Sequence, residues 1–152
     1  MELLDRLSQS FTQRGKCLAQ LAALTGQMQG LGERLTRHAE ACIYPQMKAK
    51  IEGAAAVVKT HTTALNTILS DNRAWAGLPE MPAHQGINNW ERVSGDLVTL
   101  QRLNSDLNQL AVRWLAVDGD ISERLRNIAD DQIALIDALQ EIVARSDPQA
   151  ID

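Results

Sequence analysis

The sequence predicts an all-α protein, an elongated up-down helical bundle of three to four long antiparallel helices. Three observations support this fold class. Apolar residues recur at alternating spacings of three and four along most of the 152 residues, which is the period of an amphipathic helix. The composition favours helix, because it is rich in Ala, Leu, Gln and Arg and poor in the aromatic residues that strands prefer. Proline and glycine concentrate in residues 77–86, which predicts one long loop.

The first helix is expected from Glu2 to about Ile43. Its apolar stripe is Leu4, Leu7, Phe11, Leu18, Leu21, Met28, Leu31 and Leu35. Gly26, Gly30 and Gly32 interrupt it, and each costs a helix interior up to about 1 kcal/mol relative to Ala. Either the helix breaks there, or these glycines let another backbone approach closely. We favour one helix that is weak or bent at this point.

A second helix is expected to begin at Pro45, since proline suits the first helical turn. Gly77 followed by Pro79 is the expected stop, with a left-handed glycine and a proline that cannot continue the helix. The stripe between them is Met47, Ile51, Ala54, Val58, His61, Leu65, Ile68, Asn72 and Trp75.

A third helix is expected to begin after Asn88, an N-cap with Glu91 three residues on. An apolar seam begins within it at Leu100 and continues to Ile142, along roughly 60 Å of helix. The segment Asp118-Gly119-Asp120 leaves two possibilities. Gly119 ends one helix, and Asp120 with Glu123 caps a fourth, or the seam is one long helix projecting beyond a shorter bundle. We favour the break.

We expect a single bundle domain over residues 1–146 and a loose tail over 147–152, because Asp147-Pro148 ends the last helix. Cys17 and Cys42 are too far apart along one helix to form a disulfide. No basic leader and no apolar run of about 20 residues is present, so neither a signal peptide nor membrane insertion is expected. These features predict a cytoplasmic protein.

Charge divides the chain into two unlike halves. Residues 1–76 hold nine Lys/Arg and six Asp/Glu, a net of +3, whereas residues 77–152 hold six and thirteen, a net of −7. This asymmetry favours pairing of one half with the other. The acidic second half argues against nucleic acid as a partner.

No pattern in the sequence predicts catalysis, a metal or another cofactor. His38, His61 and His84 stand on different segments, and none belongs to a Glu-x-x-His or HExxH pattern. We expect His61 to be a hydrogen-bonded or boundary residue of its stripe, and His38 and His84 to be solvated. A calcium loop beginning at Asp118 lacks the glutamate required at its twelfth position, which is Ala129. We therefore expect a protein that is not an enzyme.

The remaining functional signal is a broad apolar surface on the third helix. Its width suits either a helix with two neighbours or a groove that receives a partner helix. We predict a cytoplasmic chaperone or adaptor that binds an amphipathic helix of a partner protein. The alternative is a structural subunit that forms a homodimer through the same seam. The candidate partner-binding residues are Trp90, Leu100, Leu103, Leu107, Leu110 and Trp114.

The pattern Trp90-x-x-Val93-x6-Leu100-x-x-Leu103-Asn104 resembles the third-helix signature of FlgN-type flagellar export chaperones. The resemblance implies a cytoplasmic, all-helical, acidic protein of flagellum biogenesis and type III secretion. Such proteins bind the amphipathic C-terminal helices of hook-associated proteins before export. It also implies a partner-binding surface near Leu100, Leu103, Leu107 and Leu110.

Overall fold

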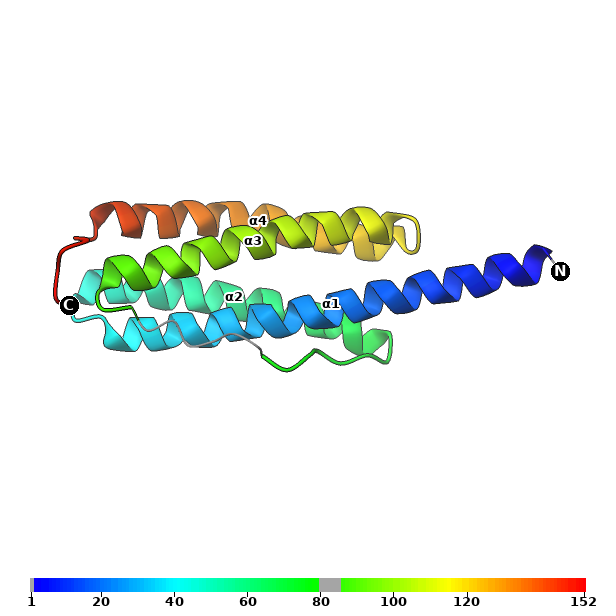
Figure 1. The fold of residues 1–152 in the computed structure, drawn as a ribbon, viewed down its shortest axis with the longest axis horizontal. Helices are drawn as coiled ribbons and strands as arrows, with labels where there is room; N and C mark the ends of the chain where they lie inside the picture. Colours follow the sequence, from blue (N-terminus) through cyan, green and yellow to red (C-terminus); the bar gives the residue numbers. More distant parts are fainter. Residues whose placement is uncertain (1, 80–85) are drawn as a thin grey trace.

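The computed structural model describes residues 2–79 and 86–152, and over these residues the protein is a bundle of four helices (Figure 1). They are α1 (Glu2–Ala41), α2 (Pro45–Asp71), α3 (Asn89–Leu115) and α4 (Gly119–Arg145). No strand occurs in the described residues. The predicted all-α bundle is therefore confirmed. Among the same residues, no helix has the length and apolar character needed to cross a membrane.

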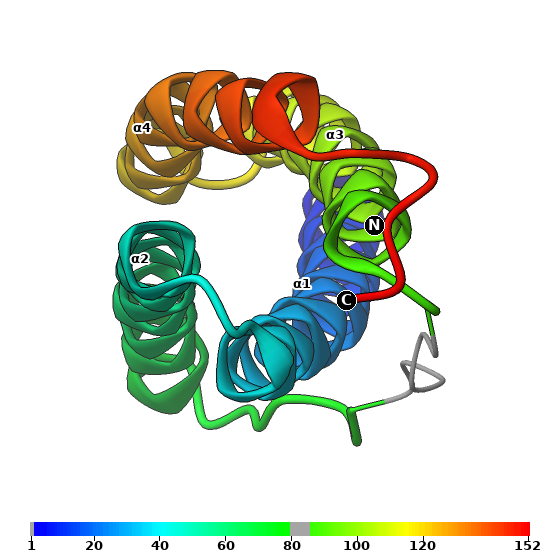
Figure 2. The ribbon, with the colours of Figure 1, turned by 90° about the vertical axis from the view of Figure 1, so that its left-hand side faces the viewer.

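The four helices stand at the corners of a square (Figure 2). α1 packs against α2 and α3, and α4 packs against the same two helices. Helices that pack together run antiparallel, as Figure 1 shows. The start of α2 and the end of α4 meet at one end of the bundle, where Ser146 Oγ lies 3.8 Å from Met47 Sδ. Asn88, just before α3, bonds the carbonyl of Pro148 at this same end.

α2 and α3 consequently begin at the same end and run in the same direction. The chain leaves α2 at the opposite end, and residues 72–79 run back alongside α1 (Figures 1 and 2). Gly77 fixes this return path, since its N–H donates to the carbonyl of Ala22 at 2.8 Å. The sequence predicted a long loop here but not that it would cross back along the bundle.

α2 ends earlier than predicted. Its last residue is Asp71, and the left-handed position belongs to Arg73 with φ 57°, whereas no described glycine has positive φ. Arg73 and Ala74 donate their N–H groups to Ser70 and Leu69, which closes the helix as a Schellman motif. The prediction of Gly77 as the left-handed stop was wrong, because a favourable hydrogen-bond pattern closes the helix with Arg73 in that position, four residues earlier. Trp75 is outside the helix and 81% exposed.

Gly26 lets another segment of backbone approach α1 closely, which was one of the two alternatives for the glycines of this helix. A Cβ on this residue would lie 2.5 Å from the carbonyl oxygen of Gly77. Glycine is therefore required where the returning chain crosses α1. α1 is continuous through residues 26–32, so no break occurs there.

The break between the third and fourth helices is confirmed. Asp118 is the N-cap, accepting hydrogen bonds from the N–H groups of Asp120 and Ile121. The prediction that Asp120 is the cap was wrong by two positions. Gly119 does not end the preceding helix either, since α3 ends at Leu115 and Gly119 is already the first residue of α4. The predicted start of α3 is confirmed, because Asn88 accepts from the N–H of Glu91 at 2.8 Å.

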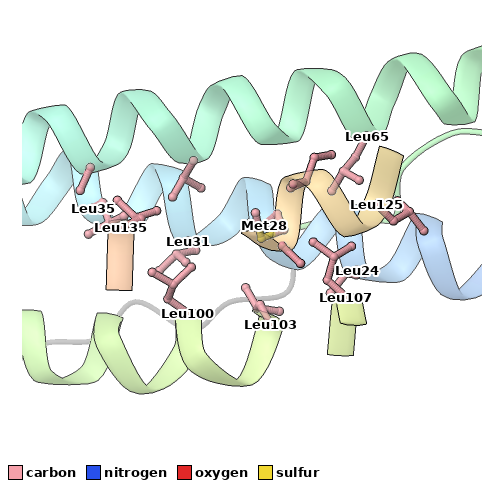
Figure 3. Packing of buried hydrophobic residues seen from close by; sticks show 14 of the residues in the cluster. Leu24, Met28, Leu31, Leu35, Leu65, Leu100, Leu103, Leu107, Leu125 and Leu135 are labelled. Atoms are coloured by element: carbon pink, nitrogen blue, oxygen red, sulfur yellow. The ribbon is translucent and has the colours of Figure 1, made fainter. Parts of the chain in front are cut away.

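The core runs along the inner faces of all four helices, and Figure 3 shows leucines of α1, α3 and α4 converging on it. Cys17 and Cys42 are buried free thiols, as predicted. Burial raises the pKa of the Cys17 thiol. The side chains of Leu21, Leu65, Leu107 and Leu139 are completely buried.

The tail differs from the loose segment expected for residues 147–152. Asn88 donates its side-chain amide to the carbonyls of Pro148 and Ala150 at 3.0 and 3.1 Å. Arg92 donates to the main-chain oxygen of Asp152 at 3.0 Å. A hydrogen bond from Tyr44 to Asp152 raises the pKa of the tyrosine, with the nearby carboxylate charge adding to the effect. The tail thus crosses the start of α3.

Candidate partner-binding surface

Five of the six predicted partner-binding residues lie in the core. Leu100, Leu103, Leu107 and Trp114 are fully buried, and Leu110 is 4% exposed. Figure 3 shows Leu100 and Leu107 facing leucines of α1. In this closed bundle α1 and α4 already cover the seam. Partner binding through it stays a prediction that requires the bundle to open.

Trp90 is separate from this group. It lies in the first turn of α3, at the end where the tail crosses, and is 36% exposed. Its indole is therefore within reach of solvent, whereas the five other residues are not. The structure does not bring the six predicted residues together on one accessible face.

An apolar groove between α2 and α4 is accessible instead. Its volume is about 500 Å³. The floor is formed by Ala54 and Leu135, which are buried core residues. Its walls are formed by Gly53 and Val57 from α2 and by Ala134 and Ala138 from α4. The charged residues along it are Lys50 on α2 and Asp131 and Glu141 on α4.

Glycine at position 53 leaves part of this groove open. A Cβ there would meet no atom within 4 Å, in contrast to Gly26, where the returning chain blocks the space. Val57 is 39% exposed, so its apolar side chain faces solvent in the absence of a partner. The groove is an apolar surface that the protein's own helices leave uncovered.

A second uncovered surface is the N-terminal part of α1, residues 2–13, which we call the α1 overhang. It extends beyond the ends of the other helices (Figure 1). Its apolar side chains are exposed: Leu3 71%, Leu4 66%, Leu7 48% and Phe11 74%. These residues follow the same helical period as the core stripe of α1. The overhang is therefore an amphipathic helix whose apolar face is bare.

The overhang is followed by Arg14, which contacts residues of the other helices at this end of the bundle. The Arg14 guanidinium lies 3.7 Å from the carboxylate of Asp118 and 5.7 Å from the centre of the Trp114 ring. It also donates to the side chain of Asn72. This one residue contacts the end of α2 and the turn between α3 and α4. The indole N–H of Trp114 has no acceptor among the described residues.

A buried polar cluster joins α1 to α3. Arg34 Nε lies 2.6 Å from Asp96 Oδ1, and His38 Nδ1 lies 2.5 Å from the other carboxylate oxygen. Arg34 also donates to the hydroxyl of Thr99 at 2.7 Å and to the carbonyl of Gly95 at 3.2 Å. The expectation that His38 is solvated was wrong, because the carboxylate of Asp96 gives it a buried partner. None of these residues lines the α2–α4 groove. The geometry of the cluster fits a role in fixing the register of α1 against α3.

His61 lies on the buried stripe of α2, as predicted. Its Nε2 is 4.0 Å from the Asp131 carboxylate across the α2–α4 interface, whereas its Nδ1 has no partner among the described residues. Burial lowers the pKa of His61, and the charge of Asp131 opposes that shift. His84 lies outside the described residues. No group of three or more potential metal ligands occurs in the described part of the chain.

Contacts between the two halves of the chain follow the predicted charge asymmetry. Arg14 and Arg34 come from the first half, and their partners Asp118 and Asp96 come from the second. His61 and Asp131 repeat this arrangement. The acidic half therefore faces basic groups of the other half inside one molecule.

The residues that carry the resemblance to FlgN-type chaperones have structural contacts here. Val93, Leu100 and Leu103 are buried in the core. Asn104 donates its side-chain amide to the carbonyl of Ala129 and to Gln132 Oε1, at 2.9 and 3.0 Å. This pattern thus packs α3 against its neighbours in the bundle.

Comparisons of the chain with protein-family models, with curated proteins and with solved structures found no match.

Sequence reasoning missed both uncovered surfaces. Several of the groove residues are Ala or Gly, which carry little apolar signal by themselves. Their spacing was the available signal, since Ala134 and Ala138 lie one turn apart on α4, beside core residue Leu135. Leu7 and Phe11 were assigned to the apolar stripe of the first helix, but the sequence does not show where the other helices end.

Proposed function

We propose that the protein is a non-enzymatic chaperone or adaptor that holds an amphipathic helix of another protein in the α2–α4 groove. The observation that carries this proposal is the uncovered apolar groove, whose floor is the bundle core itself. Helix-in-groove binding needs an elongated apolar depression on a preformed scaffold. The α2–α4 groove has both properties.

The dimensions of the groove suit a short helical segment. On α4 it extends from Asp131 to Glu141, which corresponds to roughly 15 Å at 1.5 Å per residue. Two to three turns of a partner helix match that length. Gly53 has no side chain, and Ala134 and Ala138 have only a methyl group, so a partner backbone can approach closely. A leucine or methionine of the partner then reaches the floor of the groove.

Charges on the two rims favour one kind of partner. Asp131 and Glu141 line the α4 side, whereas Lys50 lines the α2 side. A partner helix with basic residues along one edge of its apolar stripe matches the α4 rim. This complementarity contributes orientation and association rate more than affinity.

The resemblance of the α3 residues to FlgN-type chaperones supports the chaperone version. It implies that the partner is the C-terminal amphipathic helix of a hook-associated protein, bound before export. Under this proposal the protein acts in the cytoplasm. Self-association, the alternative function, is favoured by the α1 overhang rather than by this groove.

The proposal is tested with two helical peptides. One is a designed amphipathic peptide of about 18 residues, roughly five turns, with leucines at i, i+3, i+4 and i+7 and lysines on one flank. The other is the C-terminal helix of a hook-associated protein. We expect saturable binding by calorimetry and a rise in Tm, since a ligand at about 100 times its Kd stabilises by about 2.7 kcal/mol.

Two variants locate the binding site. Gly53→Leu places a side chain in the open groove without meeting another atom at Cβ, so the fold is retained and peptide binding is lost. Ala56→Leu adds the same side chain to an exposed position of α2 that does not line the groove, and binding is retained. Failure of both peptides to bind, or binding unchanged by Gly53→Leu, would overturn the proposal.

A further inference from the structure

The α1 overhang has an apolar face that continues the core stripe of the same helix. Leu4, Leu7 and Phe11 precede Leu18 and Leu21 at spacings of three, four, seven and three, which keep them on one helix face. From Leu21 onward this stripe is covered by the other helices, whereas Leu4, Leu7 and Phe11 are about half to three-quarters exposed. The overhang therefore presents a surface of the kind that packs against another helix.

The charges along this segment are arranged unevenly. Glu2, Asp5 and Arg6 lie near its tip, where two carboxylates and one guanidinium give a net charge of −1 and Arg6 pairs with Glu2, whereas the two basic residues Arg14 and Lys16 follow at its base. A second copy running antiparallel places the acidic tip of each helix beside the basic base of the other. A parallel pair places like charges together. Charge complementarity thus selects an antiparallel second copy as the occupant.

The shape of the molecule selects the same orientation. Beyond the overhang, α1 runs alongside the other helices of its own bundle, as Figure 1 shows. Two parallel overhangs would bring both bundles to the same end and the same side. Antiparallel overhangs place the two bundles at opposite ends, so both apolar faces remain free to meet.

One register pairs Leu7 with Phe11 and also brings an acidic residue opposite a basic one, with Leu4 opposite Arg14. In an antiparallel pair, facing residues have numbers with a constant sum. When Leu7 faces Phe11 of the second copy, Glu2 faces Lys16 of that copy and Leu3 faces Gly15. Nothing lies within 4 Å of a Cβ built on Gly15, so that position has room for a leucine.

We propose that the protein forms a two-fold symmetric dimer in which the α1 overhangs of two copies pack antiparallel, with Leu7 of each against Phe11 of the other. The interface is isologous, as is usual for two-fold dimers. It is separate from the α2–α4 groove, so neither proposal depends on the other.

Analytical ultracentrifugation up to about 100 µM, a range that reveals weak association, tests the dimer directly. We expect a monomer–dimer equilibrium. Phe11→Glu, which places a charge in the apolar contact, is expected to raise the dissociation constant by at least about tenfold. Val112→Glu is the matched control, because Val112 is 66% exposed on α3 and lies outside the overhang. We expect the Val112→Glu variant to dimerise like the native chain. Circular dichroism checks that both variants are folded.

Cross-linking tests the register. Leu7→Cys and Phe11→Cys are made separately in a Cys17→Ala, Cys42→Ala chain and then mixed under oxidising conditions. We expect the mixed disulfide to exceed either homodisulfide, since it joins facing positions. Preferential self-linking of Leu7→Cys would indicate a parallel pair and would overturn the proposal.

Two further outcomes would also overturn it. One is a monomer at every concentration, and the other is a dimer that Phe11→Glu leaves unchanged. The same chains are incubated with vesicles of phosphatidylcholine and phosphatidylserine. Vesicle binding by a monomer, abolished by Phe11→Glu, would assign the overhang to a lipid surface instead. The overhang holds two acidic residues, Glu2 and Asp5, against one basic residue, Arg6, which argues against that assignment because interfacial helices are rich in Lys and Arg.

Discussion

The guanidinium of Arg34 on α1 lies 2.6 Å from the carboxylate of Asp96 on α3, and both side chains are buried. Because His38 binds the second carboxylate oxygen, α1 contacts Asp96 through two successive turns. A shift of α1 along its axis would break both contacts. The pair therefore sets how far α1 extends past the other helices, and with it the length of the α1 overhang.

Removing one member of this pair is expected to be strongly destabilising. Asp96→Ala leaves the Arg34 charge buried without a counter-charge, which costs about 3–5 kcal/mol of unfolding free energy. Arg34→Ala is expected to cost a similar amount, and the double variant less than the sum of the two. Urea denaturation of the three variants measures the coupling. Strictly additive losses would contradict a direct interaction.

Two helix glycines are expected to respond oppositely to alanine. At Gly26 a Cβ would lie 2.5 Å from the carbonyl oxygen of Gly77, so Gly26→Ala displaces the returning chain and is expected to cost about 1–3 kcal/mol. At Gly53 the space is open, and Gly53→Ala is expected to gain about 1 kcal/mol from helix propensity. Thermal denaturation compares the two variants, and a gain at Gly26 would contradict the close approach.

Arg73 occupies a backbone conformation that favours glycine. Its φ is 57°, and left-handed backbone costs a residue with a Cβ about 1–2 kcal/mol. Part of the gain from Arg73→Gly is offset by the freedom of glycine in the unfolded chain. We expect a net stabilisation of about 0.5–1 kcal/mol in urea denaturation. Arg102→Gly, at an exposed position inside α3, is the control and is expected to lose about 1 kcal/mol.

The stability contributed by His61 depends on pH in a defined direction. Burial lowers the pKa of His61 in the folded state, so the folded protein disfavours the imidazolium. The unfolded chain binds this proton first, near its ordinary pKa of about 6.5. This contribution is fully present above that pH and is lost as pH falls below it. Tm measured from neutral to mildly acid pH is expected to fall less in His61→Gln than in the native chain.

The carboxylate opposite His61 supplies an independent check. Asp131 raises the pKa of His61 against the effect of burial. Asp131→Asn is therefore expected to lower that pKa further and to steepen the loss of Tm on acidification. A shallower dependence would show that another group controls the transition.

Local patterns in the sequence predicted the helices and several of their ends. The side chain of Asn88 caps α3 by accepting a hydrogen bond from Glu91, three residues on. Pro45 lies at the start of α2, where proline suits the first helical turn. The seam of α3 was also predictable as an apolar stripe, because Leu100 and Leu107 follow the helical period, but their burial was not predicted. These features depend on neighbours within a few residues, which the sequence contains explicitly.

The accessible surfaces were not predictable in this way. Leu7 and Leu21 occupy equivalent positions of one stripe, yet the first is 48% exposed and the second fully buried. The difference arises because α2 and α3 end, and α4 begins, near Arg14. His38 was assigned to solvent for the same reason, since Asp96, its partner, is 58 residues away in the chain.

The sequence by itself determined that this chain forms amphipathic helices, where most of them begin, and which residues of each helix are apolar. Helical period, capping and proline chemistry act locally, so they can be read along the chain. Only the tertiary structure decided which apolar faces are covered. Crossing of the α2–α3 connection along α1, the register set by Arg34 and Asp96, and the separation of α2 from α4 all depend on packing between distant segments. That packing leaves the α2–α4 groove and the α1 overhang uncovered.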